Sequence, residues 1–442
     1  MIADPCSDRQ CACLPARAFP PMRFDPRAEM SPAALFARVF LPFACGYYLS
    51  YLFRTVNAVI ANELARDLAL SGSALGLLTS AYFLAFAAFQ LPLGILLDRY
   101  GPRRVNGSLL LVAAIGAATF AVADSVPGLA LARGLIGLGV SACLMASMKA
   151  FVLWFPMSRL ATLNGWLMAV GGVGAMSASA PVEAALAFLS WRALFAVLAA
   201  LTLAAASVVL LVVPERPLGQ KPAPLAKLAR ELGVVYADLP FWRVAIVCMT
   251  VQAGFMSVQG LWVAPWLRDV VGFDRSERAD TLFVLALAMT AGFASSGTIA
   301  DLLARRGVAP LTLLKAGTGL AAAAFALIAS GTVRGTIAVA PWFALNFFAT
   351  SAALSYAIVS RRFPRELAGR VNTALNVLIF VAAFCIQWGI GAIMDLWPQS
   401  NGRYPVAAYR AAFGVIAALQ IASWLAIMPM REPGPMRAAT GA

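Results

Sequence analysis

The sequence predicts an all-α membrane protein with twelve transmembrane helices in two related halves of six. Of its 442 residues, 61% are hydrophobic and only 12% are charged, a composition outside the range of soluble domains. Twelve apolar runs are also long enough to cross about 30 Å of hydrocarbon, which takes about 20 residues each. The mean hydropathy of +0.81 agrees with this class.

Short polar turns separate these runs, with one long polar gap in the middle. The predicted helices are 34–62, 74–97, 104–124, 129–155, 160–188, 192–213, 241–266, 279–303, 308–330, 335–362, 367–396 and 407–429. The gap at 214–240 divides an N-terminal half at 34–213 from a C-terminal half at 241–430. A leader at 1–33, expected to be disordered, and a tail at 431–442 complete the chain. We expect Met30 to be the true start, because Met30-Ser31-Pro32 opens the first helix directly.

The distribution of basic residues predicts the orientation, since cytoplasmic loops are enriched in Lys and Arg. With a cytoplasmic N-terminus, the cytoplasmic segments hold 21 of them. The opposite side holds nine, namely Arg66, Arg133, Arg192, Arg268, Arg275, Arg278, Arg334, Arg403 and Arg410. We therefore expect a multi-pass protein of the cell inner membrane with both termini and the linker in the cytoplasm.

Composition also excludes several kinds of site. The chain has no histidine, which removes His-ligated metals and Ser-His-Asp catalysis. The leader cysteines Cys6, Cys11 and Cys13 match no zinc template. The net charge of +14 has no soluble face on which to bind nucleic acid. We expect neither a metal, nor a cofactor, nor an enzyme activity.

The two halves carry related turns after their second helices. Gly94 precedes Asp98 by four residues in the first half, and Gly297 precedes Asp301 by four in the second, each followed by a basic turn that contains glycine. An internal repeat of six helices is typical of transporters whose site lies between two halves.

The stretch Gly94 to Arg104 resembles the loop signature of the major facilitator superfamily, and the resemblance extends from about Met30 to Met430. Arg133, Gly137 and Gly139, and the pair Trp191-Arg192, are further matches. The resemblance implies a cytoplasmic gate formed by Gly94, Asp98, Arg99, Gly101 and Arg103, with Asp301 as its counterpart. It also implies that Asp98 latches against the start of the eleventh helix near Ala368, and that helices 1, 4, 7 and 10 line the path. The Gly-Pro pair typical of drug antiporters is absent from the fifth helix.

A narrower likeness concerns the first helix. Tyr47-Tyr48-Leu49, Arg54 and Asn57-Ala58 are similar to the organophosphate:phosphate antiporter branch, in which Arg residues of helices 1 and 7 grip the phosphate. Met256 stands where the second Arg is expected. The likeness therefore carries over only the expectation that Arg54 faces the cavity, not phosphate exchange.

The position of Arg54 supports that expectation independently. It follows Arg38 by 16 residues, about 24 Å of helix, so it lies within the hydrocarbon span, where charges are expensive and usually functional. Tyr47 and Tyr51 share its face at helical spacing. Lys149 in the fourth helix supplies a second cation. For both cations the alternative is a side chain that extends to the nearer membrane interface.

Neutral polar residues are expected to complete the lining from the C-terminal half. Gln252 and Gln259 share a face of the seventh helix, and Asn376 lies in the eleventh; helix packing is the alternative for each. Glu183 is the one clear carboxylate within a span, and Glu183 and Arg133 are the candidates for proton coupling.

An excess of intramembrane cations over carboxylates favours an anionic ligand, although a neutral substrate stays open. The sequence thus predicts a secondary transporter, monomeric in the bilayer, that moves a small and anionic organic solute by alternating access, with a coupled proton or ion as an option. An exporter and a non-transporting membrane sensor of the same fold are the alternatives.

Overall fold

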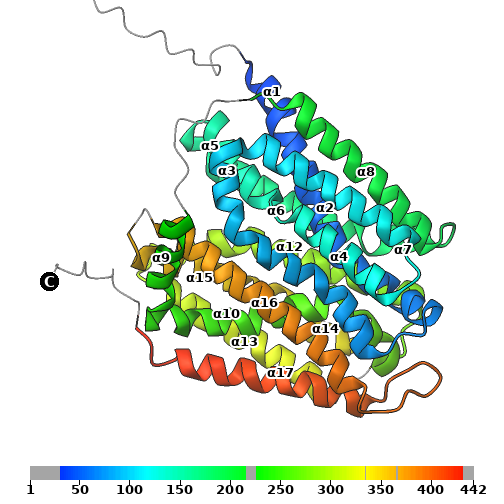
Figure 1. The fold of residues 1–442 in the computed structure, drawn as a ribbon. Helices are drawn as coiled ribbons and strands as arrows, with labels where there is room; N and C mark the ends of the chain where they lie inside the picture. Colours follow the sequence, from blue (N-terminus) through cyan, green and yellow to red (C-terminus); the bar gives the residue numbers. More distant parts are fainter. Residues whose placement is uncertain (1–29, 216–224, 334, 365–366, 432–442) are drawn as a thin grey trace, which may run out of the picture.

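The computed structural model describes residues 30–215, 225–333, 335–364 and 367–431, and within these ranges every regular element is helical (Figure 1). In chain order these elements are α1 Pro32–Leu35, η1 Phe36–Phe40, α2 Leu41–Asp67, α3 Gly72–Val122, α4 Val126–Val140, α5 Cys143–Trp154, η2 Met157–Arg159, α6 Leu160–Ser177, α7 Ala180–Leu186, α8 Trp191–Val212, α9 Leu225–Tyr236, α10 Leu239–Ser257, η3 Val258–Trp262, α11 Val263–Trp266, η4 Leu267–Val271, α12 Arg275–Ala304, α13 Pro310–Ser330, η5 Gly335–Ala338, α14 Val339–Phe348, η6 Ala349–Ala353, α15 Leu354–Arg362, α16 Ala368–Met394 and α17 Val406–Ile427. The elements η1, η3 and η4 are π-helical turns, and η2, η5 and η6 are 3₁₀ turns.

These elements join into eleven continuous stretches that are long and apolar enough to cross a membrane within the described ranges. One of them, α3, has 51 residues, about 76 Å of helix and more than twice the thickness of a bilayer core. It breaks at Gly101, whose φ of 80° and ψ of 162° are not helical. A φ of this sign suits glycine, which has no Cβ to clash. The α3 stretch therefore contains two spans, and the predicted number of twelve is confirmed.

Local sequence explains where several helices begin. Ser31, Ser71, Ser125 and Ser190 each accept a hydrogen bond from the backbone N–H three residues later, and Asp238 does the same at the start of α10. These N-caps satisfy amide groups that have no partner inside the helix. The first span continues to Asp67, five residues beyond the predicted end.

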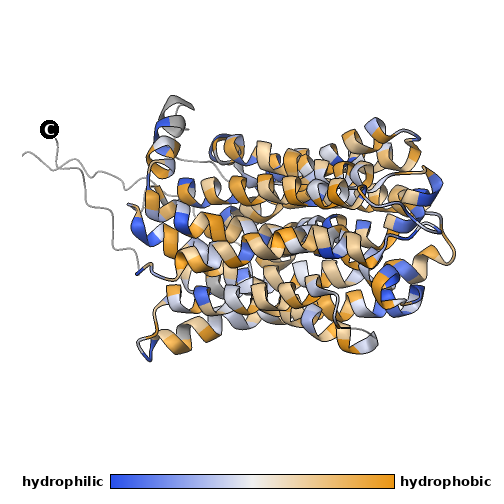
Figure 2. Ribbon diagram, turned by 90° about the horizontal axis from the view of Figure 1, so that it is seen from below, coloured by the Kyte–Doolittle hydropathy of each residue, from blue (hydrophilic) through white to orange (hydrophobic). Residues whose placement is uncertain are grey.

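The helices form two bundles side by side, one from α1 to α8 and the other from α10 to α17 (Figure 1). Hydrophobic residues cover the middle of both bundles, and hydrophilic residues gather mainly at the two ends (Figure 2). We call the end at which α1 begins and α17 stops the termini end, and the opposite one the far end.

The predicted polar linker contains a helix that sequence analysis did not anticipate. Helix α9 lies at the termini end, where the Tyr236 hydroxyl donates to the Ala374 carbonyl at 3.4 Å and Arg370 pairs with Glu231 at 3.1 Å. Burial raises the pKa of Tyr236 above its usual value. Part of the linker is therefore packed against α16, because one face of α9 is apolar.

Small residues let the two bundles approach closely. Phe86 of α3 stacks on Phe380 of α16 with ring centroids 4.0 Å apart. Nearer the far end, a Cβ at Gly391 of α16 would lie 2.1 Å from the Gly72 carbonyl oxygen. Such close backbone contacts are typical of helix packing in membranes, and they bring α3 and α16 together along the interface between the halves.

Candidate functional site

The side chain of Arg54 lies at the interface between the two bundles, among aromatic rings. Its Cζ is 4.8 Å from the ring centroid of Tyr51, 5.7 Å from that of Phe86 and 5.4 Å from that of Phe380. Its Nε is buried without a hydrogen-bond partner, and no carboxylate among the described residues pairs with it. Aromatic faces attract a cation but do not neutralise it, so this arginine lacks the counter-ion that a charge in a membrane usually has.

A small cavity of about 40 Å³ lies beside Arg54. Helix α2 contributes Tyr51 and Thr55, and the C-terminal half contributes Gln252, Gln259 and Thr350. The side-chain oxygen of Gln252 is buried without a hydrogen bond. The space is enough for a few water molecules and too small for an organic anion, so this candidate site is contracted in the present conformation.

The other predicted site residues of the first and eleventh helices lie around this cavity without lining it. Tyr47 is one turn from Tyr51, with ring centroids 5.2 Å apart, and its hydroxyl donates to the Met168 sulfur at 3.5 Å. Asn376 donates to Gln90 at 3.2 Å and accepts from the Tyr356 hydroxyl at 2.8 Å. Tyr47 therefore extends the polar face of α2, and Asn376 bridges the two halves.

Lys149 does not reach the cavity. Its ammonium nitrogen lies 2.5 Å from Oδ1 of Asp98 at the termini end. The structure thus joins a residue predicted to bind substrate with one predicted to form the gate. Within the described residues, no ion pair or hydrogen bond joins the Asp98 side chain to α16. Gly94 does approach that helix, since a Cβ there would lie 3.1 Å from the Arg370 guanidinium.

Three of the remaining predicted gate residues lie at or next to the break in α3. The Arg99 guanidinium lies 5.2 Å from the Tyr100 ring, and Gly101 forms the break itself. Arg103 donates through Nε to the Leu210 carbonyl at 2.8 Å. Asp301 lies in α12, and its side chain is outside the part of the chain that the structure describes.

The two candidates for proton coupling lie in different surroundings. Arg133 is 2% exposed, donates to the Phe53 carbonyl at 3.1 Å and lies over the Tyr82 ring at 5.2 Å. Both of these partners belong to the N-terminal half. Glu183 lies at the far end, where its carboxylate pairs with Arg275 of the C-terminal half.

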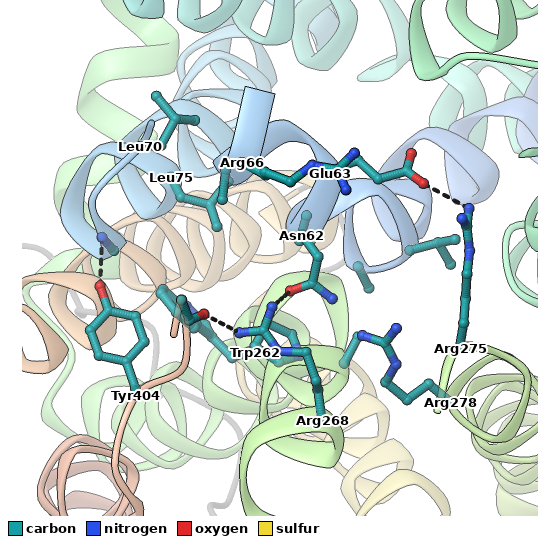
Figure 3. Close-up of a pocket in the computed structure, with 18 of the residues that line it drawn as sticks. Asn62, Glu63, Arg66, Leu70, Leu75, Trp262, Arg268, Arg275, Arg278 and Tyr404 are labelled. Atoms are coloured by element: carbon teal, nitrogen blue, oxygen red, sulfur yellow. Dashed lines mark hydrogen bonds and ion pairs between the residues drawn. The ribbon is translucent and has the colours of Figure 1, made fainter. Parts of the chain in front are cut away.

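A much larger cavity, which we call the vestibule, opens at the far end (Figure 3). Its volume is about 810 Å³. The charged residues that line it are Glu63, Arg66, Glu183, Arg268, Arg275 and Arg278. Arg275 also pairs with Glu63 at 2.7 Å, and Arg268 donates to Asn62 at 2.6 Å. The sequence predicts these arginines only as loop charges. The spacing of Arg275 and Arg278, three residues apart on one helix, is the signal that points to a shared site.

A second contact between the halves at the far end was also missed. The Asp395 carboxylate, just beyond α16, accepts from the backbone N–H groups of Gly72 at 2.7 Å and Ser73 at 2.8 Å, and from the Tyr404 hydroxyl at 2.6 Å. Burial raises the pKa of Asp395, but these hydrogen bonds lower it by more, so the pKa lies below its usual value. Burial and the adjacent carboxylate raise the pKa of Tyr404 to about 12.

Twelve spans in two bundles, with an unpaired arginine between them, define a membrane protein built around a central polar site. Residues 43–386 match the Major Facilitator Superfamily, and the chain belongs to this family. The resemblance drawn from the loop after the second helix is thereby confirmed.

Individual relatives agree with this assignment. The chain is 31% identical over 157 residues to the hexuronate transporter of Escherichia coli (strain K12), which is 36% of each chain. It is 23% identical over 385 residues to the hexuronate transporter of Bacillus subtilis (strain 168), covering 84% of this chain and 91% of the relative. The first four curated relatives are matched over only 36 to 46% of their own length.

Among solved structures, the fold is similar to a bacterial homologue of the human lysosomal transporter Spinster in an inward-facing and unoccupied conformation. The TM-score is 0.70 at 20% identity, over 90% of this chain and 97% of that one. At this identity the likeness concerns the fold alone.

Proposed function

We propose that the protein is a secondary transporter, not an enzyme, that moves a small organic anion across the inner membrane by alternating access. The observation that carries the proposal is Arg54, a cation at the interface between the halves that pairs with no carboxylate in the described part of the chain. An anionic ligand would supply the missing counter-ion. The two relatives described above are named for hexuronates, which are carboxylates at neutral pH.

In this proposal the central site uses Arg54 as its main contact. Tyr51, Gln252 and Gln259 line the adjoining space, and their hydroxyl and amide groups suit the hydroxyls of a sugar acid. The cavity must widen by several hundred Å³ to admit such a ligand. Tyr47, one helical turn from Tyr51, and Asn376, which contacts Gln90 and Tyr356, are proposed to support the site. The role of Lys149 in substrate binding stays a prediction.

The proposed orientation places the termini end in the cytoplasm, because the predicted cytoplasmic segments carry 21 Lys and Arg against nine on the other side. The vestibule then faces the outside. We propose that the protein works as a monomer in the bilayer. Coupling to a proton or ion, with Glu183 and Arg133 as candidates, stays a prediction.

The test is uptake of radiolabelled galacturonate and glucuronate into proteoliposomes. Wild-type protein is expected to accumulate at least one of them, and Arg54→Gln to lose more than about 90% of the rate. Arg192→Gln is a matched control, because Arg192 pairs with Asp124 at the far end and away from the central cavity. Equal uptake by wild-type and Arg54→Gln protein would overturn the assignment of Arg54. Binding without uptake would favour the sensor alternative, and flux only in the opposite direction the exporter.

A further inference from the structure

The vestibule is separated from the Arg54 cavity by a contact between the two halves. Arg54 lines the small cavity and Ala58, one turn further along α2, lines the vestibule. Across the interface, Gly260 lines the small cavity and Trp262 the vestibule. A Cβ at Gly260 would be only 3.5 Å from the Arg54 carbonyl oxygen. A ligand in the vestibule therefore meets a different set of side chains.

The charged residues that line the vestibule are unevenly paired. Four arginines line it against two glutamates, and both glutamates, Glu63 and Glu183, pair with the same arginine, Arg275. Arg268 is already satisfied by Asp269, Asn62 and the Gly402 carbonyl. Arg66 pairs with Asp67 at 3.5 Å, so of the four arginines Arg278 is the one with no carboxylate partner among the described residues. A local positive charge of this kind attracts anions to a cleft.

Arg278 keeps hydrogen-bond donors free for a ligand. Its Nε donates to the Asp274 carbonyl at 3.0 Å, but its two terminal nitrogens form no hydrogen bond or ion pair with any residue that the structure describes. Figure 3 shows its side chain between those of Arg268 and Arg275. A guanidinium can hold a carboxylate through two parallel hydrogen bonds, and here the outer donors are unused.

We propose that the vestibule is a second binding site, separate from Arg54, for a small organic carboxylate. Arg278 is its main contact. Arg275 is the second contact, and there the ligand carboxylate replaces the carboxylates of Glu63 and Glu183. Because Arg275 belongs to the C-terminal half and both glutamates to the N-terminal half, this exchange removes an ion-pair link between the halves. The inference rests on the proposed function for its ligand class and identifies where an anion arriving from the far end is first held.

The experiment is isothermal titration of purified full-length protein with galacturonate. Wild-type protein should bind at two sites, and Arg54→Gln and Arg278→Gln at one each. The double variant should bind at neither site. Loss of Arg278 should reduce the affinity of the vestibule site about 10- to 100-fold, as expected for a charged hydrogen bond. Arg403→Gln is the matched control, since Arg403 lies in the same far-end loop as Tyr404 but does not line the vestibule.

A further variant tests the exchange at Arg275. In the Arg54→Gln background, replacing Glu63 and Glu183 with Gln frees Arg275, and galacturonate should bind about 2- to 5-fold more tightly, the range for a partly exposed ion pair. Weaker or unchanged binding would overturn the exchange.

The outcomes separate the two proposals. One site in wild type and none in Arg54→Gln overturns the vestibule site and leaves the proposed function intact. Normal uptake by Arg54→Gln together with binding that Arg278→Gln abolishes supports the vestibule and overturns the central assignment. No binding of galacturonate to wild type overturns the vestibule proposal for hexuronates, and uptake of glucuronate then still tests the function.

Discussion

The Lys149 ammonium nitrogen lies 2.5 Å from Oδ1 of Asp98, which joins the termini end of α5 to that of the first span of α3. Both residues belong to the N-terminal half. A latch between Asp98 and the start of α16 would instead join the two halves. If Asp98 forms the predicted latch, its carboxylate has two candidate partners, and Lys149 is expected to compete with the latch.

Removing the lysine charge should alter the transport cycle more than the stability. The Lys149 and Asp98 side chains are 24% and 41% exposed, so Lys149→Met should cost less than about 1 kcal/mol of folding free energy. Uptake should nevertheless fall if Asp98, once released, forms the predicted latch that closes the termini end. Lys149→Arg, which keeps the charge, is the control. Wild-type uptake by Lys149→Met would mean that the pair takes no part in the cycle.

The contact of Asp395 with α3 should depend on pH. Its lowered pKa means that the ionised carboxylate stabilises the folded state above the ordinary carboxyl pKa of about 3.9. This contribution is lost as the pH falls through the still lower pKa of the folded state. Asp395→Asn should therefore lower the melting temperature in detergent at pH 5 to 7, and the difference from wild type should shrink below about pH 4. A difference that stays constant down to pH 3 would contradict this account.

Two glycines of α16 offer a matched pair. A Cβ at Gly391 would lie 2.1 Å from the Gly72 carbonyl, whereas a Cβ at Gly389 meets nothing within 4 Å. Gly391→Ala should force α3 and α16 apart at the far end, at a cost of about 1–3 kcal/mol, and should reduce uptake. Gly389→Ala should be neutral or stabilising by up to about 1 kcal/mol. Melting temperature and uptake measured on both variants check the prediction, and similar losses in both would refute it.

Replacing Arg133 should mainly lower the stability of the protein. Replacing it with Met removes the side-chain donor from the Phe53 carbonyl and the cation from the Tyr82 ring, at a cost of about 1–3 kcal/mol. The pH profile of uptake, measured per folded molecule, tests the predicted role in proton coupling. A shifted profile supports that role, and an unchanged profile alongside a lower melting temperature leaves Arg133 as a packing residue.

The number of spans could be predicted because it depends on a local property, the length of apolar runs. The same is true of Arg54, whose depth follows from the helical rise and whose face follows from the spacing of Tyr47 and Tyr51. Lys149 was harder, because a long side chain can turn toward either end of its helix. Only tertiary structure places Asp98 within its reach.

The far-end contacts could not be predicted for a related reason. Glu63 and Arg275 are more than 200 residues apart in the chain, and so are Gly72 and Asp395. Each pair forms only when the two halves dock, and no local periodicity encodes which loop residue meets which. Helix α9 was missed because twelve residues of mixed polarity are a weak helical signal.

The break at Gly101 also decides whether the chain crosses the membrane an even or an odd number of times. If α3 crossed the bilayer once, the described chain would make eleven crossings, and its two ends would emerge on opposite sides. One residue with a left-handed φ divides that stretch and makes the number even. The extra crossing sets the membrane side of every element after residue 101. As a result α9, the loop before α12 and the vestibule arginines each lie on the same side as their partners.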